Sequence, residues 1–191
     1  GQAVKALAMA APVLGPSVLE GARAGGDFIL NAVVREGPDR GLILAYEDDV
    51  DKVSSSAILE CLDGLLHLAA ATGEARYREA ALEALAWVGS RPYMPGTGLF
   101  YDSYDPAARA FLPRRYRVEG RPLLDDAVFL KGYLLNRDQR LLTIAEETAA
   151  RLLRDEDPPG NWVNYPPCDR ARGAIHPRHA YWWGYPMLDL Y

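Results

Sequence analysis

The chain has 191 residues, of which 49% are hydrophobic and 25% charged, so it is long and apolar enough to bury a core of its own. Its formal net charge of −5 argues against nucleic acid or an anionic membrane as a partner, because both need a concentrated basic surface. No apolar run approaches the roughly 18–20 residues of a membrane span, and the two isolated cysteines predict no disulfide framework. We therefore expect a cytoplasmic globular protein.

The N-terminal part of the chain predicts two helices and a short extended piece. Residues 3–11 form a short helical pattern that Pro12 and Gly15 should end. Ser17 has Glu20 three residues later, which is the spacing of a capping box and predicts the start of a second helix. Residues 42–46 predict an extended piece after a turn rich in glycine and proline.

A pair of helices is predicted next, and the same pattern then returns further along the chain. Residues 51–71 are apolar almost all round, whereas residues 77–88 are apolar on one face only. A shift of 64 residues places Leu66 on Leu130, Arg76 on Arg140, Tyr77 on Leu141, Ala81 on Ala145 and Val88 on Leu152 without a gap. A repeat of this kind predicts inner helices covered by outer ones.

Between the two copies lies a long connection, residues 89–120, which contains two alternating runs that predict a small β-hairpin. The second copy then begins with the apolar stretch 121–135, where Pro122 suits the first helical position and places Asp125 and Asp126 in the first turn. Two interpretations stay open for these carboxylates. They stabilise the helix N-terminus, or they open into a cavity and do acid/base work.

The C-terminal part of the chain predicts half of a further helix pair. Residues 176–191 begin a third apolar helix of the inner type, but its outer partner is missing, and the chain starts without Met. We expect the chain to be a segment of a longer one, with the uncovered apolar face completed by the missing remainder or by a second copy in a homodimer.

The turn motif from Leu68 to Tyr77, the stretch from Gly98 to Asp102 and the helix start at Leu124 to Leu130 resemble the six-hairpin glycosidase superfamily. That resemblance implies an all-α fold of repeated helical hairpins forming part of an (α/α) toroid, with a small β-hairpin or extended loop inserted. The expected organisation is a single toroid-like domain over residues 1–191, incomplete at one or both ends.

Within that superfamily, the paired aspartates resemble those of unsaturated glucuronyl and rhamnogalacturonyl hydrolases, which implies a general acid/base role for Asp125 or Asp126. The segment with His176 and His179 is similar to one in N-acylglucosamine 2-epimerases, which implies proton shuttling by histidine instead. Residues 98–127 also resemble the toroidal region of thioredoxin-domain proteins of unclear activity. The three resemblances imply different activities.

Further residues could complete a sugar site. Asp49 precedes the inner helix of the preceding hairpin and is a candidate second carboxylate, although a solvated acidic turn explains it as well. Flat aromatic faces for sugar stacking would come from Tyr101, Tyr104, Trp162, Tyr181, Trp182 and Trp183, although core packing explains the run from Tyr181 to Trp183 equally well. Arg115 lies in a basic loop and could hold a substrate carboxylate. Pro177 disturbs the two histidines as a helical pair, so no metal is expected.

The most consistent hypothesis is a carbohydrate-active enzyme that hydrolyses a glycosidic bond by carboxylate chemistry, with a small carbohydrate as substrate, no cofactor, and no nucleic acid or membrane as partner. The sugar could be an unsaturated uronic acid. A sugar epimerase that uses His176 and His179 is the enzyme alternative. A non-catalytic helical scaffold or sugar-binding domain is the alternative of a different class.

Overall fold

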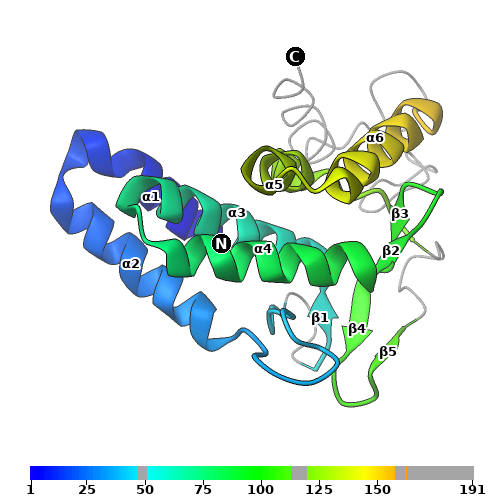
Figure 1. Cartoon of the computed structure of the whole chain (residues 1–191), viewed down its shortest axis with the longest axis horizontal. Helices are drawn as coiled ribbons and strands as arrows, with labels where there is room; N and C mark the ends of the chain where they lie inside the picture. Colours follow the sequence, from blue (N-terminus) through cyan, green and yellow to red (C-terminus); the bar gives the residue numbers. More distant parts are fainter. Residues whose placement is uncertain (47–50, 113–119, 158–161, 163–191) are drawn as a thin grey trace. The chain divides into compact units, whose positions relative to one another are not determined.

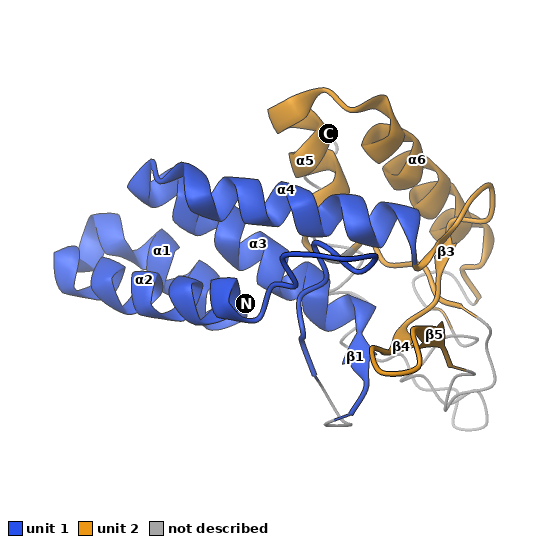
Figure 2. Ribbon diagram, turned by 60° about the horizontal axis from the view of Figure 1, so that its bottom comes forward, with its two compact units in different colours: residues 1–91 blue, residues 92–191 orange. Residues whose placement is uncertain are grey.

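The computed structural model describes residues 1–46, 51–112, 120–157 and 162, and the chain divides into two compact units, residues 1–91 and 92–191 (Figure 2). The first unit contains α1 (Gln2–Leu14), α2 (Pro16–Asn31), β1 (Val53–Ser54), α3 (Ser55–Thr72) and α4 (Ala75–Ser90). The second contains β2 (Tyr93–Met94), β3 (Leu99–Phe100), β4 (Ser103–Asp105), β5 (Ala110–Phe111), the 3-10 turn η1 (Asp125–Ala127), α5 (Val128–Asn136) and α6 (Gln139–Arg154). The described residues are mostly helical, as predicted, with short antiparallel ladders added.

The first unit is built from two helical hairpins, α1 with α2 and α3 with α4, and α1 also packs against α3 (Figure 1). The first helix was predicted to end at Pro12 and Gly15; α1 continues through Pro12 to Leu14, and Gly15 is its C-cap. A proline near the end of a helix gives up only one hydrogen bond. The predicted capping box is wrong: Pro16 occupies the first position of α2, and the residue before it, Gly15, carries the left-handed φ of 96°.

The repeat predicted from the sequence is present in the helices. α4 and α6 have bounds that differ by 64 residues at both ends, and α3 and α5 end 64 residues apart. Five buried residues of α6, each 64 positions after a buried residue of α4, are Leu141, Ile144, Ala145, Thr148 and Leu152. The two outer-type helices therefore bury the same face, and this confirms the alignment of the two copies.

The turn between the helices of each pair also repeats. The residue after the first helix is left-handed in both copies, with φ of 72° at Gly73 and 59° at Arg137. An acid follows and pairs with an arginine two residues later. The distance from Arg76 Nε to Glu74 Oε2 is 2.9 Å, and that from Arg140 Nη2 to Asp138 Oδ2 is 2.6 Å. A hydrogen bond from Arg23 in α2, followed by the one from Arg76, holds the pKa of the Glu74 carboxyl below its ordinary range, and the bond from Arg140 does the same for the pKa of Asp138.

In the first unit the same turn is tied to α2. Arg23 Nε donates to Glu74 Oε1 at 2.8 Å, and Arg76 Nη1 lies 2.7 Å from Asp27 Oδ1. The Tyr77 hydroxyl also donates to Asp27 Oδ1, at 2.7 Å. Burial, followed by this hydrogen bond, raises the pKa of Tyr77 to about 12. The motif that resembles the glycosidase superfamily therefore has a structural task here, because it links two helical hairpins.

The second unit departs from the repeat at the start of its first helix. The prediction of a helix from Pro122 is wrong: α5 begins only at Val128, and residues 122–124 are not helical. The reason is that the Arg121 backbone pairs with Phe100 in an antiparallel bridge, which needs extended backbone. α5 is also less enclosed than predicted for an inner helix, since Leu134 and Leu135 are exposed.

Two short antiparallel ladders precede this helix in the second unit. In the first, Tyr93 pairs with Phe100 and Met94 with Leu99. The second pairs Tyr104 with Phe111 and Asp105 with Ala110. The small hairpin predicted in the connection is thus present, although residues 113–119 of its second predicted run lie outside the described residues.

Candidate active site

The carboxylate of greatest interest, Asp126, lies in a strained turn immediately before α5. Asp126 has φ 54° and ψ 16°, and Ala127 has φ 52° and ψ 31°, so two consecutive residues with side chains adopt the left-handed conformation. Each such residue costs on the order of 1–3 kcal/mol and persists only where the surroundings impose it. Asp126 is also buried, with 8% of its surface exposed. Strained backbone of this kind clusters at functional sites.

The prediction that the two aspartates lie in the first turn of the helix is wrong. α5 has no acidic residue in its first turn, and its N-cap is Ala127. Asp125 lies in the same 3-10 turn as Asp126, but its side chain is outside what the structure describes. The turn itself is closed by a hydrogen bond from the Ala127 N–H to the Leu124 carbonyl at 3.1 Å.

A buried ion pair lies at the beginning of the segment that carries this turn. The Arg121 guanidinium meets the Asp102 carboxylate twice, with 3.2 Å from Nε to Oδ2 and 3.4 Å from Nη2 to Oδ1. Both residues are buried, with 7% and 8% of their surface exposed. Removing two charges from water is costly, and the attraction between them often only compensates for it. The pair is therefore poorly explained by stability alone.

Phe100 connects the ion pair to α5. Its backbone N–H donates to the Arg121 carbonyl at 2.9 Å and its carbonyl accepts from the Arg121 N–H at 3.0 Å. Its ring stacks on Phe129, in the first turn of α5, with 5.4 Å between ring centroids. Arg121 and Phe129, the two ends of the segment that contains Asp126, are thus both held on Phe100.

The strands that present Phe100 are anchored on α6. The turn between β2 and β3 places Gly98, with φ 67°, where an added Cβ would lie 2.3 Å from the Glu147 carbonyl oxygen. The Glu147 carboxylate accepts hydrogen bonds from the Tyr93 hydroxyl and, at 2.9 Å, from the Gly96 N–H. Burial, and then the bond to Glu147, raises the pKa of Tyr93 above its ordinary value. The hairpin of β2 and β3 is thus held on α6 both at Tyr93, in its first strand, and at Gly96 and Gly98, in its turn.

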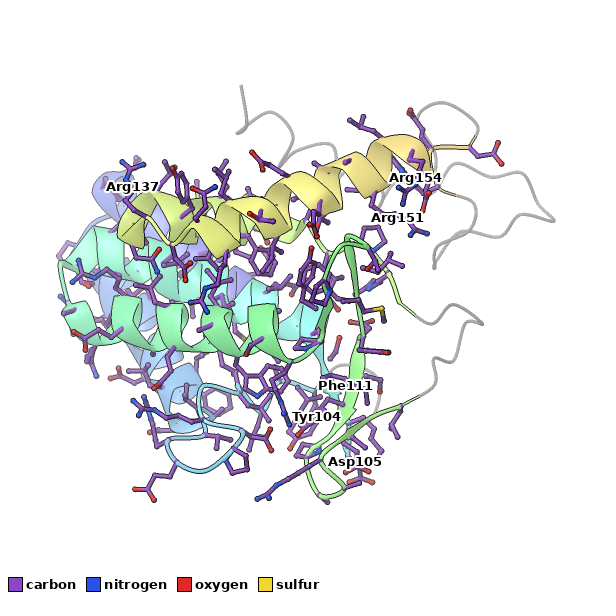
Figure 3. The ribbon with its side chains drawn as sticks, turned by 45° about the vertical axis from the view of Figure 1, so that its right-hand side comes forward. Tyr104, Asp105, Phe111, Arg137, Arg151 and Arg154 are labelled. Carbon is purple, nitrogen blue, oxygen red and sulfur yellow. The ribbon has the colours of Figure 1, made fainter. Side chains whose placement is uncertain are left out.

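Aromatic side chains surround the second ladder. Tyr101, one of three predicted sugar-stacking residues within the described part of the chain, is 38% exposed and stacks on Phe111 with 5.0 Å between centroids and 22° between planes. Another, Trp162, is buried and donates its Nε1–H to the Leu152 carbonyl at 2.7 Å, so it packs in the core. Tyr104 contacts the same ring from β4 at 4.9 Å (Figure 3). Tyr104 is buried, so its neighbour Tyr101 offers the accessible aromatic surface.

Seven of the predicted site residues lie outside the described residues, so their predicted roles stay predictions: Asp49, Arg115, His176, His179, Tyr181, Trp182 and Trp183. His67, a further histidine within α3, has its Nε2 3.6 Å from Oδ1 of the buried Asp63. Lys5 approaches the other oxygen of Asp63 at 2.6 Å. In the part of the chain that the structure describes, no group of three histidine, cysteine or acidic side chains is placed to hold a metal ion.

Sequence reasoning missed Asp102 and Arg121 as members of the site. Asp102 ends the stretch that resembles the superfamily, and Arg121 directly precedes the helix that was predicted. Nothing in the spacing of 19 residues between them indicates a buried pair, because the contact depends on the bridge between Arg121 and Phe100.

Burial raises the pKa of the Cys61 thiol in α3, so little of it is the reactive thiolate, and Cys61 is not a ready nucleophile.

Comparison with known proteins shows the fold and leaves the activity open. No family model matches the chain, and no curated protein matches it. A solved structure described as a possible member of the GH105 family, from Klebsiella pneumoniae subsp. pneumoniae, is similar with a TM-score of 0.65 at 14% sequence identity. The match covers 86% of this chain and 46% of that one. The chain therefore has part of a six-hairpin glycosidase-like fold and spans about half the length of the protein it matches.

Within the described residues, no helix combines the length and apolarity needed to cross a membrane.

Proposed function

We propose that this chain belongs to a glycoside hydrolase and that Asp126 is its general acid/base. The observation that carries the proposal is the Asp126 carboxylate itself, buried and held in a left-handed backbone at the start of α5. The resemblance to unsaturated glucuronyl and rhamnogalacturonyl hydrolases implies an acid/base aspartate at this helix start. The fold shared with a possible GH105 member supports the same class of enzyme.

The chemistry needs few groups. Hydrolysis of a glycosidic bond, or hydration of an unsaturated sugar, requires a carboxyl group that donates a proton and a group that activates water. Asp126 would serve as the proton donor and Asp125, its neighbour in the 3-10 turn, is the closest candidate in sequence for a supporting carboxylate. Asp49 remains the predicted carboxylate from the preceding hairpin.

Tyr101 is proposed as a sugar-stacking residue. Tyr101 is 38% exposed, and its ring stacks on Phe111, which restricts its orientation. Aromatic faces of this kind combine apolar contact with a polar edge, as the two faces of a pyranose ring require. The substrate class proposed is an unsaturated uronic-acid glycoside, for which Arg115 would supply the carboxylate contact.

The test is turnover of saturated and unsaturated uronic-acid glycosides by the full-length protein and by Asp126→Asn. Asparagine is among the residues that tolerate the left-handed region best, so this exchange removes the acid and keeps the backbone. Loss of a general acid/base should lower kcat by about 100–10,000-fold. Asp125→Asn, measured in parallel, decides which of the two carboxylates is the acid.

The matched control is Asp138→Asn, at the N-cap of α6 in the same unit. Asp138 accepts a hydrogen bond from the Arg140 N–H at 3.0 Å, and asparagine can accept the same bond. This variant should retain turnover. Sugar binding without turnover, unchanged in Asp126→Asn, would instead support the non-catalytic sugar-binding domain and refute the hydrolase.

A further inference from the structure

We propose that Arg121 and Asp102 are positioning residues, whose buried ion pair holds the strained turn that carries Asp126. The inference rests on the proposed function for its catalytic meaning, but the structural coupling it describes can be measured without a substrate. The pair lies outside the turn and is argued to act through the backbone that joins the two.

The backbone between Arg121 and Phe129 forms a closed path. Arg121 is bonded to Phe100 through both its N–H and its carbonyl, and the Phe129 ring stacks on the Phe100 ring. The segment leaves Phe100 in extended conformation and must return to it within eight residues, which is the sequence separation of Arg121 and Phe129. A reversal is needed in between, and Asp126 and Ala127 supply it with their positive φ angles.

The ion pair fixes the start of that path. Asp102 lies two residues after Phe100, in the connection from β3 to β4, so the chain next to the Arg121 backbone bridge also binds its guanidinium. An arginine held by two backbone bonds and by an ion pair in which Nη2 donates to the carboxylate has little freedom to slide along the strand. Pro122, Leu123 and Leu124 are buried as well, so movement at Arg121 would be transmitted along the segment to the turn.

The substrate-free experiment is a thermal-unfolding cycle with Ala127→Gly, which relieves a left-handed alanine. The exchange is made in three backgrounds: the wild type, Asp102→Asn/Arg121→Gln, and Asp138→Asn/Arg140→Gln. The last is the control, because it neutralises an exposed pair in the same unit that is not connected to the turn. The loss of the Ala127 methyl is common to all three backgrounds and cancels in the comparison.

If the buried pair maintains the strain, neutralising it lets the turn relax, and Ala127→Gly then has less strain to relieve. In the Asp102→Asn/Arg121→Gln background, the change in Tm caused by Ala127→Gly should be less favourable than in the wild type by about 2–4 °C. In the Asp138→Asn/Arg140→Gln background, the change in Tm caused by Ala127→Gly should equal that in the wild type. Equal changes in all three backgrounds would overturn the proposal. Should Asp102→Asn/Arg121→Gln fail to fold, Arg121→Lys takes its place, since lysine keeps the charge but lacks the planar fork.

The second readout is kinetic. Misplacement of the acid should lower kcat by about 100-fold in Asp102→Asn/Arg121→Gln with little change in KM, and Arg121→Lys should recover part of the loss. Loss of turnover only in proportion to the folded fraction would refute the positioning role. If the Tm cycle shows coupling but the wild type has no turnover, the structural role of the pair is supported and the hydrolase is refuted. The two proposals can therefore fail separately.

Discussion

Gly98 offers a direct test of how the strand that bears Phe100 is fixed on α6. Gly98→Ala should cost about 1 kcal/mol for a side chain at φ 67°. A second cost of about 1–3 kcal/mol follows because the new Cβ would lie 2.3 Å from the Glu147 carbonyl oxygen and 2.7 Å from the Arg151 Cβ, so backbone must move. We expect a total loss of about 2–4 kcal/mol in the free energy of unfolding.

Gly96 provides the matched control two residues earlier in the same turn. It has φ 76°, but no atom lies within 4 Å of its added Cβ, so Gly96→Ala should pay only the conformational cost. Thermal unfolding followed by circular dichroism should show a Tm lower by about 2–4 °C for Gly96→Ala and by at least twice as much for Gly98→Ala. Equal losses in the two variants would refute the close approach of this turn to α6.

Three further predictions test the repeat and the helical turns. Arg137→Gly should raise the free energy of unfolding by about 0.5–1 kcal/mol, because Gly73 occupies the same left-handed position in the first copy, and an unchanged or lower value in urea titrations would contradict this. Leu141→Ala, on the buried face of α6, should lower it by about 2–5 kcal/mol, and a loss typical of a surface site would contradict that burial. Tyr77→Phe should cost about 1 kcal/mol at pH 8 through the lost bond to Asp27. Since folding raises the Tyr77 pKa from 10.0 to about 12, the protonated phenol stabilises the fold below pH 10, and this contribution is lost as the pH rises through 12. Wild type and Tyr77→Phe should therefore converge over that range, and a constant difference in urea titrations at pH 8 to 11 would refute it.

Much of the helical architecture could be predicted because it depends on local patterns. The one-sided apolar face of residues 77–88 and its return after 64 residues identify two outer-type helices, and α4 and α6 confirm both. The left-handed turn with its acid and arginine follows from short-range chemistry, in which glycine, a helix cap and a nearby opposite charge act within a few residues. Pattern and spacing are sufficient for features of this kind.

The candidate site could be predicted only in part, because its geometry depends on contacts between distant residues. The aspartates at 125 and 126 stand out in the sequence as two charges in an apolar stretch, but the first helical turn expected for them is absent. A proline followed by apolar residues predicts a helix at Pro122, and the bridge from Arg121 to Phe100 overrides that local preference. Such long-range pairing leaves no periodic trace in the sequence.

The repeat itself supplies the strongest argument that the turn at Asp126 serves function. α3 extends over residues 55–72, and the equivalent range in the second copy is 119–136, of which only residues 128–136 form α5. A continuous helix is therefore a structure that this repeat can adopt. The second copy has in the first half of this range a buried ion pair and two left-handed residues, and both features are costly. Costs that the first copy avoids need a gain elsewhere, and the presentation of a buried carboxylate at a helix start is the gain that the chemistry of glycoside hydrolysis would provide.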